Sequence, residues 1–184
     1  ALAALPGEVG LRLLARLLLA VGGGEHTPRL ERLEGLYAAL AAGSDGARTL
    51  AGCRLVPSGG RMLVCREPGR VAPPVELLPG GRIRWDGRFE AVVAPDAPAG
   101  LRLGALGPRG RRGLAALMGK ARPEPVPVCA WAALPALYGE QGIFAVPHLG
   151  YNRDGAGRVV PILRAAPCHG LTVSACAGGN RHYL

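Results

Sequence analysis

Glycine and proline interrupt this sequence so often that long helices are confined to its beginning. Of the 184 residues, 29 are Gly and 17 are Pro, and they follow no collagen-like period. Such frequent turn residues favour short strands over a helical bundle. Apolar residues make up 49% of the chain, enough to bury a core as one domain or two small ones. We therefore expect an α+β fold: an N-terminal helical pair, a mostly antiparallel sheet, and a small β-rich C-terminal domain.

Apolar residues at helical spacing predict two helices within residues 7–42. The glycines at 22–24 should end the first helix, because glycine accepts the left-handed conformation of a C-cap. Thr27 and Pro28 should begin the second helix, as N-cap and first helical residue. The expected buried stripes are Leu11, Leu14, Leu18 and Val21 in the first helix, and Leu30, Leu33, Tyr37 and Leu40 in the second.

Residues 50–56 and 61–67 predict a β-hairpin around the turn cluster 57–60. Placing the middle of that cluster at the turn pairs Val56 with Arg61. In this register one face, assigned to the core, carries Ala51, Cys53, Leu55, Met62 and Val64, while Arg54 and Arg61 share the wetter face.

Short strands are expected through most of the remaining chain. They lie at about 75–78, 82–85, 88–94, 134–137 and 143–146. Trp85 and Phe89 should pack together across the tight turn at 86–87. The linker-like residues 95–100 suggest two domains, 1–94 and 95–184, and we expect 152–184 to be loosely ordered in part.

Positive charge dominates this chain, with 22 basic against 13 acidic residues and a net charge of +9. A basic excess is typical of a nucleic-acid surface and less often of a surface that meets acidic membranes. The charge is concentrated in residues 101–122, which hold six cations and no acid. There the sequence predicts a glycine-rich loop at 107–113, whose backbone N–H groups can approach phosphates closely, and a short helix at 114–120. A solvated loop is the alternative.

The candidate nucleic-acid-binding residues follow from this charge pattern. The first set is Arg109, Arg111, Arg112, Lys120 and Arg122, and the second set is Arg29, Arg32, Arg54 and Arg66. Replacing Arg111 and Arg112 by alanine should weaken RNA binding and flatten its salt dependence by about two units of slope or less.

Enzyme and metal motifs are missing from the sequence. It has no paired-carboxylate spacing, no Gly-x-Ser-x-Gly motif and no P-loop, so we expect no catalytic, cofactor or metal site. Its five cysteines form no Cys-x-x-Cys pair, which favours reduced core thiols in the cytoplasm. The stretch 58–60 is similar to the start of a pyrophosphatase nucleotide loop, but we interpret it as a turn, and His148 as a packed or surface side chain. The apolar run at 11–21 is too short for a membrane span.

Several short stretches match one known family in order along the chain. They are residues 8–11, 21–24, 28–33, 50–54, 65–67, 85–89, 134–137 and 146–151. Together they resemble the portion of bacterial tRNA(Ile)-lysidine synthetase that follows its catalytic domain, in its alphaproteobacterial form. The resemblance covers roughly residues 5–151.

The resemblance implies an ATP-dependent ligase acting on tRNA. Such an enzyme adenylates the wobble cytidine of an isoleucine tRNA with ATP and Mg²⁺, and lysine then displaces AMP. The ATP-pyrophosphatase domain lies upstream in that family, and the chain begins at Ala1 without Met, so we expect a fragment that is inactive alone and binds no cofactor itself. The implied parts are a substrate-binding region at 1–94 and a tRNA-contacting domain at 95–184.

The expected partners are tRNA and the enzyme's own N-terminal catalytic domain, and neither a membrane nor DNA. In that role, arginines would contact phosphate and sugar and recognise tRNA shape more than base sequence. Two other functions stay open from the sequence. The chain could be a basic protein-interaction module that docks an acidic partner, or a free-standing enzyme whose site carries no known motif.

Overall fold

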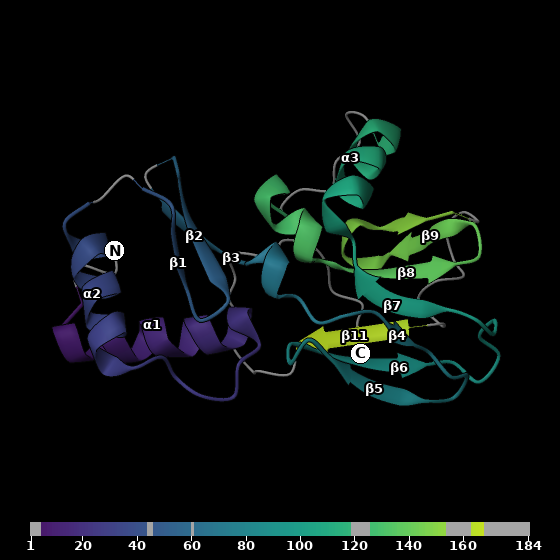
Figure 1. Cartoon of the computed structure of the whole chain (residues 1–184), viewed down its shortest axis with the longest axis horizontal. Coiled ribbons are helices and arrows are strands. Elements are labelled where there is room, and N and C mark those ends of the chain that lie inside the picture. The colour runs from purple at the N-terminus through teal and green to yellow at the C-terminus, as the bar shows by residue number, and fades with distance from the viewer. Residues whose placement is uncertain (1–4, 44–45, 60, 119–125, 154–162, 168–184) are drawn as a thin grey trace. The chain divides into compact units, whose positions relative to one another are not determined.

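The computed structural model describes residues 5–43, 46–59, 61–118, 126–153 and 163–167, which fall into two compact units, Ala1–Arg70 and Val71–Leu184 (Figure 1). The predicted α+β class is confirmed, with helices first and antiparallel sheets after them. The contacts divide the chain after Arg70 rather than between residues 94 and 95, because the strands within 82–93 contribute to the core of the second unit. The functional division into 1–94 and 95–184 stays a prediction.

The first unit begins with the two predicted helices, α1 (Gly7–Gly22) and α2 (Leu30–Ala41). Gly23 ends α1 in the left-handed conformation, with φ 65°, and its N–H donates to the Leu19 carbonyl at 2.9 Å. The start predicted for α2 at residues 27–28 is wrong by two residues, because the N-cap is Arg29 and the first helical residue is Leu30. The first intrahelical bonds run to the Arg29 carbonyl, and no side chain caps the helix.

Three antiparallel strands complete this unit, in the order β1 (Arg48–Leu50), β2 (Cys53–Ser58) and β3 (Arg61–Arg66). Val56 pairs with Leu63 and not with Arg61, because the hairpin turn lies one residue later than predicted. This slip of two residues leaves the side chains of β2 and β3 on their predicted faces, since the faces of a strand alternate with period two. Accordingly, Cys53, Leu55, Met62 and Val64 face the helices. The prediction for Ala51 was wrong, because this residue lies in the turn before β2 and not on the core face of a strand.

The turn between β1 and β2 is formed by Ala51 and Gly52, both with left-handed backbone (φ 51° and 72°). Two glycines next to this turn, Gly22 of α1 and Gly52 of the turn itself, leave no room for a Cβ. A Cβ added to Gly22 would lie 2.2 Å from the Ala51 carbonyl oxygen, and one added to Gly52 would lie 2.2 Å from Nη1 of Arg66. This arrangement therefore requires glycine at position 22, on α1, and at position 52, the second residue of the turn.

The second unit contains two antiparallel sheets. One has the order β10-β9-β8-β7-β4, and the other β11-β6-β5. The strands of the first are β4 (Val75–Glu76), β7 (Arg102–Ala105), β8 (Pro135–Gly139), β9 (Gly142–Val146) and β10 (Tyr151–Asn152). Those of the second are β5 (Arg82–Trp85), β6 (Phe89–Val93) and β11 (Leu163–Pro167). The strand β11 was not predicted; the rest of the expected loose tail, beyond residue 153, lies outside the described residues.

Strands β8 and β9 are buried on both faces. Leu137 and Ala145 belong to the cluster shared by the two sheets, whereas their neighbours Ala136 and Val146 belong to a cluster that also contains residues of α3 (Gly107–Met118). This alternation explains why the sequence of β8 is almost continuously apolar. The helix is thereby fixed to one face of the five-stranded sheet (Figure 1).

A tight turn joins β5 to β6, as predicted. Asp86 and Gly87 adopt left-handed backbone, with φ 54° and 65°, and the rings of Trp85 and Phe89 stack with their centroids 6.2 Å apart. The predicted packing of these two aromatic residues is confirmed. In the described part of the chain, none of the helices combines the length and the apolar character that crossing a membrane requires.

Candidate nucleic-acid interface

The basic segment forms a helix where the sequence predicted a loop. Residues 107–113, assigned to a glycine-rich loop, are the first two turns of α3, which runs from Gly107 to Met118. Packing overrides the low helix propensity of the glycines here. Leu114 is 1% exposed, inside the cluster beneath the helix. Phosphate would thus meet a helix surface and its first turn rather than an extended loop.

The arginines of α3 differ in exposure. Arg109 and Arg112 are exposed, and their spacing of three places them on one face of the helix. Arg111 is half-buried. The first turn of α3 carries no acidic residue, so its unpaired N–H groups add to the positive potential. Lys120 and Arg122 lie outside the described residues.

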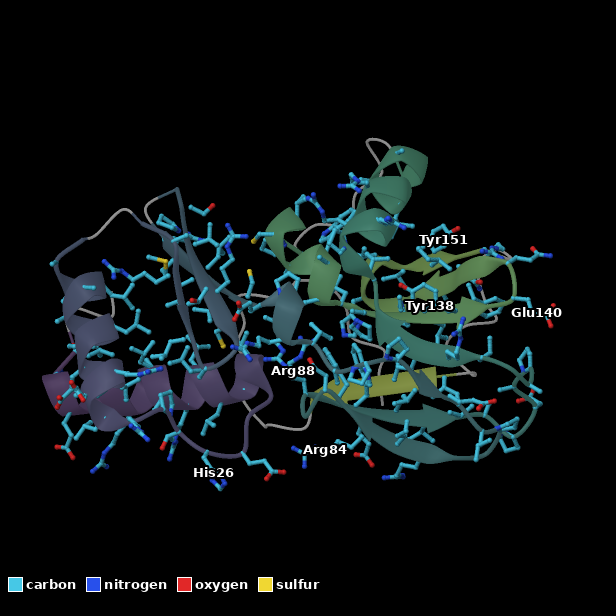
Figure 2. The ribbon with its side chains drawn as sticks, viewed as in Figure 1. His26, Arg84, Arg88, Tyr138, Glu140 and Tyr151 are labelled. Atoms are coloured by element: carbon cyan, nitrogen blue, oxygen red, sulfur yellow. The ribbon has the colours of Figure 1, made fainter. Side chains whose placement is uncertain are left out.

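Contacts with the sheet hold the start of α3 in place. The hydroxyl of Tyr138 donates to the carbonyls of Ala105 at 2.6 Å and Leu106 at 3.2 Å, immediately before the helix (Figure 2). Burial raises the pKa of Tyr138 above its usual value. Gly110 allows the helix to lie close to the side chains of Leu106 and Ile143, since a Cβ at this position would lie 2.8 Å from Leu106 Cδ1 and 3.1 Å from Ile143 Cδ1. The basic face is therefore presented by a fixed element.

Two neighbouring hollows bring together cations of the first unit. One has a volume of about 390 Å³ and the other about 510 Å³. Both are lined by Arg32, Leu50 and Ala51. The first is completed by His26, Pro28 and Arg29, and the second by Thr49, Gly52, Arg66, Glu67 and Arg70. Three of the predicted residues, Arg29, Arg32 and Arg66, thus line these hollows.

Sequence reasoning missed two of the polar lining residues, His26 and Arg70. His26 lies in the loop between α1 and α2 (Figure 2). Arg70 ends the short helical turn η2 (Pro68–Arg70). No local motif marks either one, because only the fold brings both loops beside the β1–β2 turn. Arg54, by contrast, is exposed on β2 and is absent from the lining of both hollows described.

Arg66 is held in position by backbone carbonyls. Its Nη1 donates to the Gly52 carbonyl at 3.2 Å, and its Nη2 donates to the carbonyl of Arg70. The guanidinium therefore bridges the β1–β2 turn and η2, and its charge is fixed at the side of the larger hollow.

Asp86 and Arg88 form a buried ion pair in the second unit. Asp86 accepts from Nε of Arg88 at 2.6 Å and from the backbone N–H of Ala72 at 2.8 Å. Arg88 also donates to the Ala133 carbonyl at 2.7 Å and lies 4.7 Å from the centre of the Phe89 ring (Figure 2). Because both side chains are nearly inaccessible, this pair is unsuited to binding a phosphate.

His148 is packed, in keeping with its interpretation as a packed or surface residue. Its ring meets that of Phe89 edge-on, with centroids 5.4 Å apart. Burial, together with the charge of Arg88, lowers the pKa of His148 to about 4. It is therefore neutral near pH 7. Across the described residues, no group of three or more His, Cys, Asp or Glu side chains could hold a metal ion.

Comparison with known proteins gives one consistent group of relatives. A protein of Caulobacter vibrioides is 32% identical over 163 residues, which is 84% of this chain and 38% of that protein. One of a Methylobacterium species is 47% identical over 75 residues, 38% of this chain and 22% of the relative. One of Ruegeria pomeroyi is 35% identical over 85 residues, 46% of this chain and 19% of the relative.

All three relatives carry the name tRNA(Ile)-lysidine synthase. The chain spans well under half the length of each of them. No family model and no solved structure matches the chain.

Proposed function

We propose that this chain, whose resemblance to alphaproteobacterial tRNA(Ile)-lysidine synthases is confirmed, is the tRNA-binding part of such an enzyme. The whole enzyme would use ATP to join lysine to the wobble cytidine of an isoleucine tRNA in the cytoplasm. The observation that carries the binding role is the exposed pair Arg109 and Arg112 on one face of α3, in a helix without acidic residues. The similarity to the Caulobacter protein supports the choice of tRNA.

The proposed contacts use charge and shape. Arginines neutralise phosphates, release counterions and fix the orientation of the RNA, but carry little base information themselves. A helix held by the hydrogen bonds of Tyr138 is suited to this work, because the backbone positions from which its arginines extend are fixed before binding. We propose as further contacts with the tRNA the remaining candidate residues, Arg111, Lys120, Arg122, Arg29, Arg32, Arg54 and Arg66.

The Ser-Gly-Gly stretch does not fit a nucleotide-binding loop. Ser58 ends β2 and pairs with Arg61 across a hairpin, so it leads into a second strand and not into a helix. We accordingly propose that ATP and Mg²⁺ are bound by a catalytic domain elsewhere in the protein, and that this chain alone is inactive.

A salt titration tests the binding role. We expect Arg109→Ala combined with Arg112→Ala to weaken binding of an isoleucine tRNA and to reduce the slope of log K against log salt by about two or less. The matched control is Arg102→Ala on β7, which removes an exposed arginine outside α3. Filter binding between about 50 and 200 mM salt measures both quantities.

Two outcomes would contradict the proposal. In one, the double variant binds tRNA with unchanged affinity and salt slope. In the other, polyglutamate, an acidic polymer of protein, binds as tightly as tRNA of equal charge, which would favour a module that docks an acidic protein partner.

A further inference from the structure

The two hollows of the first unit adjoin one another around the β1–β2 turn. Both share Arg32, Leu50 and Ala51. Their volumes, about 390 and 510 Å³, lie in the range that small-molecule-sized groups fill. We name the two together the turn hollow and define it by the residues that line the two parts.

Cations dominate the lining of the turn hollow. Four arginines line it, namely Arg29, Arg32, Arg66 and Arg70. Glu67 is the single acid of the lining. Such an excess of guanidinium groups favours a ligand that carries negative charge on several oxygens, as phosphate does.

The turn at the centre of the hollow is preorganised. Ala51 holds a left-handed φ of 51°, a conformation that residues with a Cβ rarely adopt. The carbonyl of the next residue, Gly52, accepts a hydrogen bond from Nη1 of Arg66 at 3.2 Å. Arg66 is therefore already oriented in the unbound protein, and less conformational entropy is lost when an anion meets the hollow.

Apolar atoms lie between the charges. Leu50 and Ala51 contribute to both parts, and Pro28 contributes to the smaller one. A nucleotide unit presents the same combination, because its phosphate is charged while its sugar and base faces are partly apolar. A bare inorganic anion would leave the apolar part unused.

We propose that the turn hollow binds the phosphate of a nucleotide unit, as a second tRNA contact independent of α3. This inference rests on the proposed tRNA-binding function. Arg32 has the central role because it lines both parts of the hollow. Arg70 contributes from η2, and Arg66 is a positioning residue whose guanidinium holds the turn and η2 together.

Substitutions in the full chain test the site. Arg32→Ala and Arg70→Ala should each weaken tRNA binding roughly three- to tenfold near 0.1 M salt and lower the salt slope by about one. Glu67→Gln should strengthen binding, because it removes the single acid of the lining. The control is Arg16→Ala, an exposed arginine of α1 that is not in the lining.

A second measurement identifies the source of the phosphate. Backbone NMR signals of Ala51 and Gly52 are followed during separate titrations with tRNA, AMP and inorganic phosphate. Shifts with tRNA, lost in Arg32→Ala, support a backbone phosphate of RNA. Shifts with AMP at lower concentration than any tRNA effect would support a free nucleotide as the ligand and overturn the RNA contact. Signals that stay unchanged in all three titrations would overturn the site itself.

The failure of this inference and of the proposed function are distinguishable. If the α3 double variant weakens tRNA binding while Arg32→Ala and Arg70→Ala do not, the turn hollow is rejected and the proposed function stands. Unchanged tRNA binding in all of these variants rejects both.

Discussion

Single residues with left-handed backbone show where this chain departs from ordinary turn chemistry. The β1–β2 turn needs positive φ at both central positions, a conformation for which Asn-Gly is the preferred pair. Here Ala51 occupies the first position and Gly52 the second. The hydrophobic pattern alone does not reveal such a turn, and the sequence placed Ala51 on the core face of a strand.

Replacing Ala51 should therefore change stability in a predictable direction. We expect Ala51→Asn to raise the free energy of unfolding by about 1 kcal/mol, because asparagine tolerates this backbone conformation. Gly52→Ala should lower it, because a φ of 72° is strained for a residue with a Cβ and because the new Cβ would displace the Arg66 guanidinium from the Gly52 carbonyl. Urea unfolding measures the free energy of unfolding of both variants. A stabilising effect of Gly52→Ala would contradict the described turn.

The protonation of His148 predicts a pH dependence. Its folded-state pKa of about 4 lies below the ordinary value of 6.5, so the unfolded chain binds this proton more readily. The stability contributed by neutral His148 is complete above about pH 6.5 and is lost as the pH falls toward 4. Between pH 7.5 and 5 the loss should be on the order of 2 kcal/mol.

The matched variant for this prediction is His148→Gln, which stays neutral throughout. The difference in unfolding free energy between pH 7.5 and 5, measured with urea, should be smaller for the variant than for the natural chain. An equal pH dependence of the two proteins would show that His148 is not the group responsible.

At the scale of elements, the sequence predicted strands and faces well and boundaries less well. The β2–β3 hairpin keeps its predicted faces in spite of the register slip, because a slip of two residues does not move any side chain to the other face. Helix α3 was missed over its first two turns, since its three glycines have poor helix propensity and its stability comes from the sheet below. The pairing of β11 with β6 was missed because no local pattern in 163–167 specifies it.

The candidate site was predictable only in part, for a similar reason. Charge density in the sequence identifies Arg109 and Arg112, whose spacing suits a helix face as well as a loop. It does not identify His26 or Arg70, which approach Arg32 only through the fold. Residues that are separated along a chain form one site when turns and strand ends bring them together. The composition of the sequence does not predict which residues become neighbours in this way.

Two glycines of α3 distinguish the observed helix from the predicted loop. Gly113 has open space around the position of a Cβ and lies in the helix interior, so Gly113→Ala should stabilise the protein by up to about 1 kcal/mol. Gly110→Ala should be less favourable, because its Cβ would meet Leu106 and Ile143. Thermal unfolding of the two variants gives the comparison. Destabilisation by Gly113→Ala would argue against a helix at this position.

For the whole molecule, the two units have separate cores, and they carry different spectroscopic reporters. The core cluster of Leu14, Leu18 and Leu55 lies within Ala1–Arg70, whereas Trp85 and Trp131, the only tryptophans of the chain, lie within Val71–Leu184. Tryptophan fluorescence therefore reports on the second unit alone. Far-ultraviolet circular dichroism reports on both units, with α1 and α2 from the first.

A cavity in the first core should separate the two signals. Leu18 is fully buried, and Leu18→Ala should cost about 2–5 kcal/mol. We expect the variant to lose part of its helical circular dichroism at lower urea concentration than the natural chain, while its fluorescence transition stays where it was. Coincident shifts of the two transitions would instead mean that the units unfold as one cooperative body.

The position of β11 has a consequence for any shortened form of this protein. It covers one side of β6, the central strand of its sheet, through five residue pairs. A chain that stopped before residue 163 would leave the amide and carbonyl groups on that side of β6 without their partners. An unpaired strand edge of this kind can pair with a strand of another copy, so truncation there would promote self-association. The arginines proposed to bind RNA would all remain in the shortened chain.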